Sequence, residues 1–197
     1  MFKPLTTLSM VAALALAAPA LAQEKTGDSP AESQLDLGQP ADDGPQLGQR
    51  YSKRKFDDWD LACIKTQAEQ DPCSLLQVMN GPDGKPMAEF SLFRLEGGER
   101  AVAAATVVVP LETLLPAQLT IAIDDHPGKR YQYSFCNPIG CVAQIGLTKE
   151  DIAAMKKGKK AVLSLVPAPA PDQVVRLTLS LKGFTAGYEA VDVVKNQ

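Results

Sequence analysis

Four cysteines constrain the fold of this chain more than any other feature. They form two closely spaced pairs, at Cys63, Cys73, Cys136 and Cys141. A cysteine pair can be a redox catalyst, part of a metal site or a structural disulfide. Which of these applies depends on the compartment in which the chain works and on the number of residues between the two cysteines.

The N-terminus indicates export. Lys3 precedes an apolar run over residues 8–18 that is too short for a membrane span, and residues 20–22 read Ala-Leu-Ala, a typical cleavage site. We therefore expect a signal peptide over residues 1–22, and no cysteine follows the cut that would carry a lipid anchor. The exported chain is expected in the periplasm or outer envelope, or secreted, where an even number of cysteines typically forms disulfides.

The spacing inside each pair favours local disulfides. Four residues separate Cys136 from Cys141, whereas a thioredoxin-type dithiol has two. The Asn-Pro-Ile-Gly spacer has Asn, Pro and Gly at the first, second and fourth positions, which a type I turn prefers. Such a turn would place the two cysteines opposite each other in a hairpin, close enough to bridge. Cys63 and Cys73 flank another polar, turn-like connection, and we pair them likewise.

Two rivals to the local pairing stay open. The loop-entropy model assigns about 2 and about 3 kcal/mol to the shorter and longer local loops, but about 4.5 kcal/mol to crossed pairs, so energy does not select the local pairing. Zinc held by all four thiolates is the second rival. The spacings lack the tight Cys-x-x-Cys form, and an exported chain favours oxidation.

Composition divides the rest of the chain into a tether and one domain. Residues 23–50 are rich in Gly, Pro, Ser and acids and contain no aromatic residue, so they are expected to form a disordered acidic tether. Residues 51–197 have a length that suits one domain. With 20 basic and 23 acidic residues, the chain is mildly acidic, which disfavours nucleic-acid binding.

Hydrophobic alternation predicts a β-rich domain. Apolar residues recur at every second position over residues 59–63, 131–135 and 175–181, the period of a half-buried strand. Further strands are expected at 74–79, 87–95, 101–109, 119–123, 142–147 and 161–166. One helix is expected after Thr148, ending at Gly158 in a left-handed C-cap, and a second within 185–194. The expected architecture is two packed antiparallel sheets with one or two short helices.

Few residues suggest chemistry. The chain has one histidine, His126, which lies in an Asp/Pro/Gly turn, so a catalytic triad or a histidine-rich zinc site is hard to build. We therefore expect no catalytic residue, no metal and no cofactor. Four aromatic residues could line a ligand pocket, but their strand period favours the core: Trp59, Tyr131, Tyr133 and Phe135.

Two basic runs are candidate contacts for an anionic glycan or lipid: Lys53, Arg54 and Lys55, and Lys156, Lys157, Lys159 and Lys160. The acidic net charge of the chain offers these runs no supporting long-range field. The second run also follows the expected helix, where lysines are favoured by the helix dipole alone.

Several motifs together resemble a known family. They are residues 56–63, Cys73 followed by Gln77, Val109-Pro110-Leu111, residues 135–143 and residues 179–184. In this order, behind an export signal, they resemble the invasion-associated locus B family of exported alphaproteobacterial proteins, from about Lys55 to the C-terminus. The resemblance implies an immunoglobulin-like β-sandwich, a virulence-associated role in host-cell invasion, and no known catalytic activity. Of the site residues it transfers only the four cysteines, as structural residues.

The leading functional hypothesis is an exported, non-enzymatic β-sandwich that binds an unknown protein or envelope partner. Its candidate surfaces are strand edges and the loop at residues 81–85. One alternative is a periplasmic thiol–disulfide protein that uses Cys136 and Cys141, which requires an accessible thiol of low pKa. Another is a module that binds an anionic glycan or lipid through the two basic runs.

Replacing Cys136 by serine is expected to cost about 2 kcal/mol of unfolding free energy, because the short loop is then no longer closed in the unfolded chain. Urea unfolding of the oxidised wild type and of the variant measures the difference. A reduced protein with the same melting temperature as the oxidised protein would contradict a bridge at this position.

Overall fold

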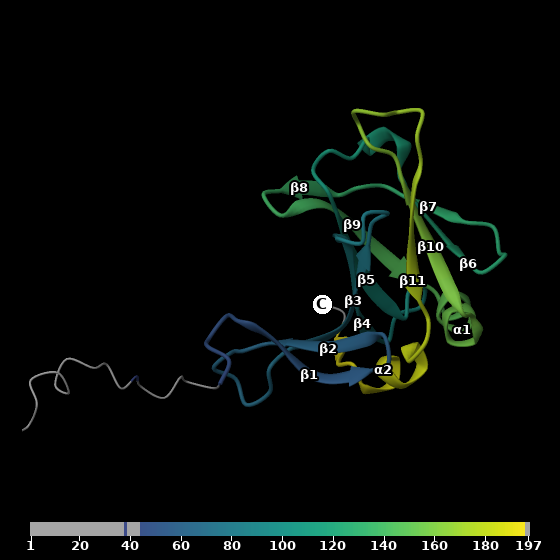
Figure 1. Cartoon of the computed structure of the whole chain (residues 1–197). Helices are drawn as coiled ribbons and strands as arrows, with labels where there is room; N and C mark the ends of the chain where they lie inside the picture. Colours follow the sequence, from purple (N-terminus) through teal and green to yellow (C-terminus); the bar gives the residue numbers. More distant parts are fainter. Residues whose placement is uncertain (1–37, 39–43, 196–197) are drawn as a thin grey trace, which may run out of the picture. The chain divides into compact units, whose positions relative to one another are not determined.

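The computed structural model describes residue 38 and residues 44–195. Two β-sheets pack against each other, and two short α-helices lie toward one end of them (Figure 1). The larger sheet contains β1 (Arg50–Phe56), β2 (Trp59–Ile64), β3 (Cys73–Asn80), β4 (Pro86–Glu96), β5 (Ala103–Val109), β8 (Phe135–Asn137), β9 (Gly140–Leu147) and β12 (Val193–Lys195). The smaller sheet contains β6 (Leu119–Ile123), β7 (Lys129–Tyr131), β10 (Lys160–Leu165) and β11 (Val175–Ser180). The helices are η2 (Leu115–Ala117), a 3-10 turn, α1 (Lys149–Lys157) and α2 (Phe184–Ala190).

The strand order of the larger sheet is β1-β2-β3-β4-β5-β9-β8, and that of the smaller sheet is β11-β10-β6-β7. Every pairing between the described strands is antiparallel except that of β12, which runs parallel to β4. The inner faces of both sheets carry the buried alternate residues, as the period of two predicts. The expectation of an all-β sandwich with two short helices is confirmed.

The core is centred on Trp59. Its indole ring is 1% exposed and meets the ring of Phe90 edge-on, with 5.9 Å between ring centroids. The ring of Phe184, from the first turn of α2, lies on it at 5.3 Å. Aromatic pairs in such tilted geometries add to the stabilisation that comes from burial. Trp59, which lies on β2, therefore connects β4 of the larger sheet with α2.

The two sheets are hydrogen-bonded to each other through the side chain of Gln77. This side chain projects from β3 and is 8% exposed. Its amide oxygen accepts from the backbone N–H of Ser180 at 2.7 Å, and its amide nitrogen donates to the backbone carbonyl of Ser180 at 3.1 Å. The indole N–H of Trp59 donates to the same carbonyl at 2.9 Å. The end of β11 is thus paired with side chains of the other sheet in place of a neighbouring strand.

The C-terminal segment closes over the larger sheet. Gly183 precedes α2 with a φ of 85°, and a side chain there would collide with the backbone carbonyl of Phe56, so only glycine fits. After α2, the guanidinium of Arg94 donates twice to the carbonyl of Val191, at 2.7 and 3.0 Å. The carboxylate of Asp192 accepts the backbone N–H of Cys73 at 2.8 Å. These bonds hold β12 against β4.

The predicted caps of α1 are correct at one end and wrong at the other. The Thr148 hydroxyl accepts the Asp151 N–H, and the Asp151 carboxylate accepts the Thr148 N–H, which completes a capping box. Gly158 was expected in a left-handed conformation, but its φ is −74° and its ψ is 167°. The chain leaves the helix in an extended conformation because the Asp124 carboxylate accepts the N–H groups of Lys159 and Lys160, which start β10.

Three boundaries differ from the sequence-based prediction. The tether was expected through residue 50, but Gly48 donates to the carbonyl of Lys65 and Arg50 begins β1, so the fold starts earlier. β1 itself was not predicted, because its run of charged residues hides any alternation. Residues 131–135 were expected as one strand, but β7 pairs in the smaller sheet and β8 in the larger. The signal peptide prediction lies outside the described residues.

Replacing Gln77 by alanine is expected to lower the unfolding free energy by about 2 to 3 kcal/mol, because the backbone N–H of Ser180 loses its partner inside the fold. Gln144 is the matched control, since it is exposed on β9, and its replacement by alanine should change stability by less than about 0.5 kcal/mol. Urea unfolding of both variants measures the difference. Equal stabilities of the two variants would refute the role of Gln77.

Candidate functional site

All four cysteines of the chain are in disulfides, with the local pairing that the turn chemistry predicted. Cys63 bonds to Cys73 and Cys136 to Cys141, and the Cα atoms of each pair lie 4.0 Å apart. Cys63, Cys73 and Cys141 are each buried in the core, with exposed fractions of 7% or less. A thiol–disulfide catalyst presents an accessible sulfur to its substrate. Cys136, by contrast, is exposed on β8. Burial therefore supports a structural role for the Cys63–Cys73 bridge, and the turn that closes the hairpin supports it for the Cys136–Cys141 bridge.

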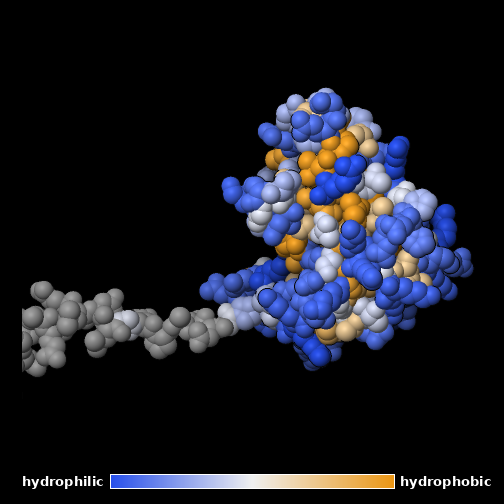
Figure 2. Space-filling model, turned by 45° about the vertical axis from the view of Figure 1, so that its right-hand side comes forward, coloured by the Kyte–Doolittle hydropathy of each residue, from blue (hydrophilic) through white to orange (hydrophobic). Residues whose placement is uncertain are grey.

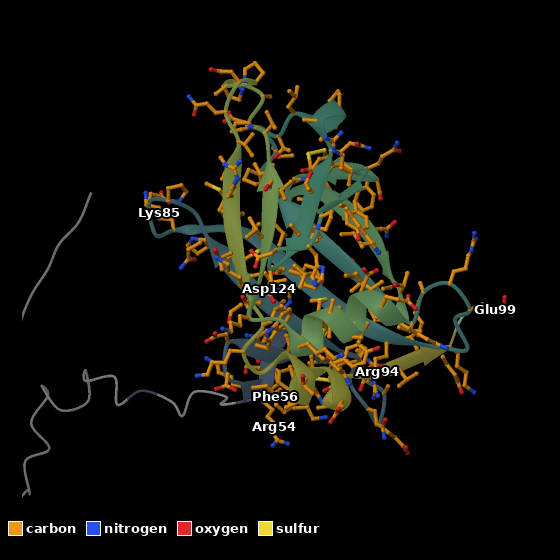
Figure 3. The ribbon with its side chains drawn as sticks, turned by 90° about the vertical axis from the view of Figure 1, so that its right-hand side faces the viewer. Arg54, Phe56, Lys85, Arg94, Glu99 and Asp124 are labelled. Atoms are coloured by element: carbon orange, nitrogen blue, oxygen red, sulfur yellow. A yellow bond between two sulfur atoms is a disulfide. The ribbon has the colours of Figure 1, made fainter. Side chains whose placement is uncertain are left out.

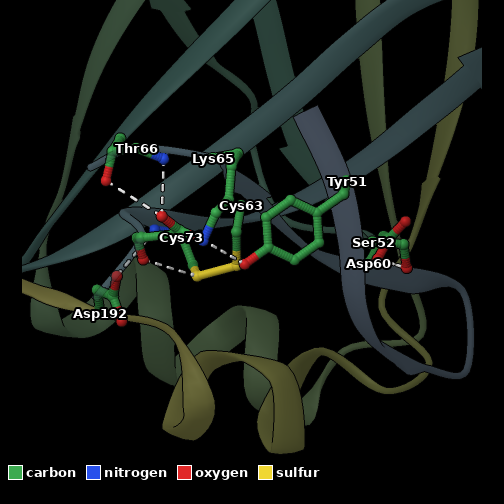
Figure 4. The surroundings of a disulfide bond; sticks show 9 residues. Tyr51, Ser52, Asp60, Cys63, Lys65, Thr66, Cys73 and Asp192 are labelled. Atoms are coloured by element: carbon green, nitrogen blue, oxygen red, sulfur yellow. Dashed lines mark hydrogen bonds and ion pairs between the residues drawn. A yellow bond between two sulfur atoms is a disulfide. The ribbon is translucent and has the colours of Figure 1, made fainter. Parts of the chain in front are cut away.

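A polar network surrounds the Cys63–Cys73 bridge (Figure 4). The Asp71 carboxylate accepts from the Thr66 N–H at 2.7 Å, the Tyr51 hydroxyl at 2.8 Å and the Lys65 ammonium at 3.2 Å. The first of these bonds, followed by the others, lowers the pKa of Asp71 far below its usual value. The hydrogen bond that the Tyr51 hydroxyl donates to Asp71 raises the pKa of the Tyr51 phenol. This end of the larger sheet is thus fixed by a bridge and by ionic hydrogen bonds together.

The Cys136–Cys141 bridge supports an exposed apolar tip. Asn137 pairs with Gly140, which leaves Pro138 and Ile139 as the two-residue loop. The Asn137 side-chain oxygen accepts the Ile139 N–H at 3.0 Å and fixes the turn. Ile139 is 78% exposed. The alternation predicted that Phe135 lies in the core, and this prediction is wrong, because the side chain is half exposed.

The strand registers extend this apolar surface across the outer face of the larger sheet. Residues that pair across neighbouring strands share a face, and one row of such pairs runs over β8, β9, β5, β4 and β3. Its members are Phe135, Val142, Val108, Glu89 and Val78. They lie on the face opposite the core, which is lined by the residues that alternate with them, and all except Val142, which is 4% exposed, keep accessible surface. We call these five residues the outer row.

A shallow groove of about 490 Å³ lies beside the outer row. Its walls come from Val78, Pro86 and Met87 of the β3–β4 hairpin, from Val108 and Pro110 at the end of β5, and from Ile139. One ion pair edges it, in which the Arg50 guanidinium meets the Glu89 carboxylate at 2.8 Å. Hydrophobic side chains also gather in a band on the face of the molecule shown in Figure 2. The sandwich thus leaves apolar surface uncovered.

A second hollow, of about 310 Å³, penetrates the core between the two sheets and beneath α1. The larger sheet contributes Phe90 and Leu147, the smaller sheet Ile121, Ala161 and Leu179, and α1 contributes Met155. All of these except Ile121 are at most 5% exposed. Each of these residues lies in a strand or helix that the sequence predicted, but no local signal indicated that the two sheets and the helix leave a space between them. We call this hollow the inter-sheet pocket.

Polar residues stand at the inter-sheet pocket: His126, Lys129, Tyr131, Glu150 and Asp151. The Lys129 ammonium donates to the Asp151 carboxylate at 2.6 Å, and the Thr148 N–H donates to the same carboxylate at 3.0 Å. Burial raises the pKa of Asp151, but these hydrogen bonds outweigh it and leave the pKa below its usual value. The bond to Asp151 in turn raises the pKa of Lys129. Both groups are charged at neutral pH.

The aromatic residues that the sequence predicted in the core differ in how deeply they are buried. Trp59 is buried as expected, whereas Tyr131 and Tyr133 pack against the core from partly buried positions. Burial raises the pKa of the Tyr133 phenol to about 12. Its oxygen is the one buried side-chain oxygen or nitrogen in the described chain that has no hydrogen-bond partner. Tyr131 also lines the inter-sheet pocket, a position that its strand period did not indicate.

The basic runs are occupied with structural contacts. Lys53 lies at a bulge in the edge strand β1, and the Arg54 guanidinium covers the Phe56 ring at 4.8 Å, at the lower end of Figure 3. Charged, bulged edge strands resist pairing with other chains. In the second run, Lys156 lies over the Tyr188 ring and pairs with Glu189 at 3.2 Å. Lys55, Lys157, Lys159 and Lys160 are exposed. These contacts give the runs roles that need no anionic ligand.

The described residues contain no group of three or more His, Cys, Asp or Glu side chains placed to hold a metal ion. His126 is exposed in the turn between β6 and β7, as its sequence context predicted. No helix among the described residues is long and apolar enough to cross a membrane.

Comparison with known proteins gives consistent relatives. The family model described as "Invasion associated locus B (IalB) protein" matches residues 59–192. Two curated proteins of Brucella abortus, from strain 2308 and from biovar 1 strain 9-941, are named invasion protein B homologs. Each is 26% identical over 140 residues, which cover 71% of this chain and 78% of the relative. The crystal structure of invasion associated protein b from Bartonella henselae has the same fold, with a TM-score of 0.59, 21% identity, and coverage of 69% of this chain and 91% of that one.

Replacing Asp151 by asparagine is expected to destabilise the protein at pH 7, because the ion pair with Lys129 is lost. A carboxyl whose pKa is lowered by folding stabilises the fold above its unfolded pKa, near about 3.9, and loses that contribution as the pH falls through the folded pKa. The difference in unfolding free energy between wild type and variant should therefore shrink below about pH 4. Urea unfolding at pH 7, 5, 4 and 3 tests this, with Asp125→Asn on the neighbouring turn as control. A difference that stays constant from pH 7 to pH 3 would contradict the ion pair.

Proposed function

The chain belongs to the Invasion associated locus B family, and from that premise we propose that it is an exported, non-enzymatic β-sandwich that binds a protein partner in the bacterial envelope. The outer row is the observation that carries this proposal. It consists of four apolar residues, of which only Val142 is buried, and the Glu89 carboxylate, on the sheet face opposite the core. Contiguous apolar surface of this kind marks interaction sites in soluble proteins.

The partner is an extended segment of another envelope protein. β8 is the terminal strand of the larger sheet's order, so a segment can add a further strand beside it through main-chain hydrogen bonds. Alternate side chains of that segment would meet Phe135 and the exposed Ile139 next to the groove. The opposite edge strand, β1, carries the charged residues and bulge that discourage such pairing. The two edges of one sheet are thus unlike, and only one suits strand addition.

The two disulfides support this function by fixing the surface before the partner arrives. The Cys136–Cys141 bridge closes the hairpin that carries Ile139. A surface held in its bound conformation loses less conformational entropy on association. The names of the curated relatives associate those proteins with invasion, and on that ground we extend the proposal to a role for this chain in host-cell invasion. The signal peptide expected over residues 1–22 supports the periplasm or outer envelope as the location of the chain, or its secretion.

A site-specific photocrosslinker at Ile139 tests the proposal in the native envelope. We expect it to capture one protein partner, and we expect Val78→Glu to abolish this capture, because a charge then interrupts the apolar strip. Val174→Glu is the matched control, since Val174 has the same exposed fraction of 46% as Val78 but lies outside the groove.

Three results would contradict the proposal: equal capture in Val78→Glu and wild type, a crosslinked product with twice the mass of this chain, and lipid as the captured species. Circular dichroism and melting temperature confirm that both variants fold.

A further inference from the structure

We propose that the inter-sheet pocket binds a small amphiphile with a single alkyl chain and a cationic headgroup. This site is separate from the groove on the outer face, since the two share no lining residue. The inference therefore stands whether or not a protein docks on the outer row.

The walls of the pocket select an alkyl chain. They come from three elements, the two sheets and α1. Phe90, Leu179 and Met155 line it and are otherwise fully buried in the core. A hollow bounded by such residues is poorly hydrated, so each methylene group that a ligand moves into it from water favours binding.

The size of the pocket limits the ligand to one chain. Its volume of about 310 Å³ lies at the small end of the range of roughly 300–1,000 Å³ seen for small-molecule sites. It is also about twice the volume of a cavity of roughly 150 Å³ that accepts benzene. Two acyl chains with a glycerol backbone would not fit.

The charges at the pocket select the headgroup. Asp151 already accepts from Lys129 and from Thr148, so this carboxylate and ammonium neutralise each other. Glu150, next to it in the first turn of α1, lines the pocket and is exposed. Its own backbone N–H and the Thr148 side chain hold its pKa below the usual value, so it is ionised at neutral pH. The polar residues therefore carry one carboxylate in excess, which attracts a cation and repels an anion.

Tyr131 adds a second cation-binding feature. Its ring lines the same pocket, and aromatic faces attract quaternary ammonium groups through the ring quadrupole. A chain inserted toward Phe90 would leave its headgroup at the polar residues, where Glu150 and Tyr131 stand. An alkylammonium satisfies both features, whereas a fatty acid carboxylate would add a further negative charge beside Glu150.

Trp59 supplies a built-in reporter. It is the one tryptophan of the chain, and its ring contacts the ring of Phe90, which lines the pocket. Decyltrimethylammonium, titrated into the full exported chain below its micelle-forming concentration, should change the fluorescence of Trp59 and raise the melting temperature. We expect decanoate to bind at least about tenfold more weakly, a difference equivalent to about 1.4 kcal/mol.

Two variants separate the chain site from the headgroup site. Ala154→Leu fills the pocket from α1 and should abolish binding, whereas Ala153→Leu, on the exposed face of the same helix, should leave it unchanged. Glu150→Lys should keep the fold but reverse the preference, so that decanoate binds more tightly than decyltrimethylammonium.

The proposal is overturned if neither amphiphile binds, if both bind the wild type equally, or if Ala154→Leu binds as tightly as Ala153→Leu. The last result would indicate adsorption to exposed apolar surface elsewhere, including the outer row.

Discussion

The junction between the two sheets depends on the side chain of Gln77, which makes the backbone hydrogen bonds that a neighbouring strand would otherwise make. Gln77 leaves the larger sheet and bonds both backbone groups of Ser180 in the smaller sheet, and Trp59 bonds the same Ser180 carbonyl. Sheets in a sandwich are ordinarily joined by apolar packing, which is strong but not directional. Here a buried amide adds direction and fixes where β11 ends relative to β3. Gly183 and α2 follow directly after the end of β11, so this junction also positions them. Through α2 it positions β12 beside β4.

The stabilising devices are distributed so that one face stays available. The bridge between β2 and β3 and the Asp71 network hold the end of the larger sheet near the C-terminal segment, and the second bridge holds the hairpin of β8 and β9. Cys63, Cys73 and Cys141 are buried on the core side, whereas Cys136 is exposed on β8. The core side thus supports the outer row from beneath, and four of its five residues keep accessible surface, whereas Val142 is buried.

Local chemistry in the sequence predicted much of this, and long-range geometry was not accessible to it. The period of two identified most strands, and the spacer between Cys136 and Cys141 identified their pairing, because each signal lies within a few residues. The alternation over residues 131–135 wrongly predicted one continuous strand, because no local feature shows that β7 and β8 join different sheets. No local sequence signal predicts the contact between Lys129 and Asp151, because 22 residues separate them. The outer row needs four strand registers, which a single sequence does not provide.

Hydrogen exchange at the backbone N–H of Ser180 tests the central claim most directly. The Gln77 bond should protect this amide to the level of amides in the middle of β10 and β11, because it opens only when the two sheets separate. Measurement by NMR on the oxidised protein at neutral pH gives the protection factor residue by residue. Exchange at the rate of an amide in the exposed loop between β3 and β4 would show that the sheets are joined by packing alone, and would contradict the account.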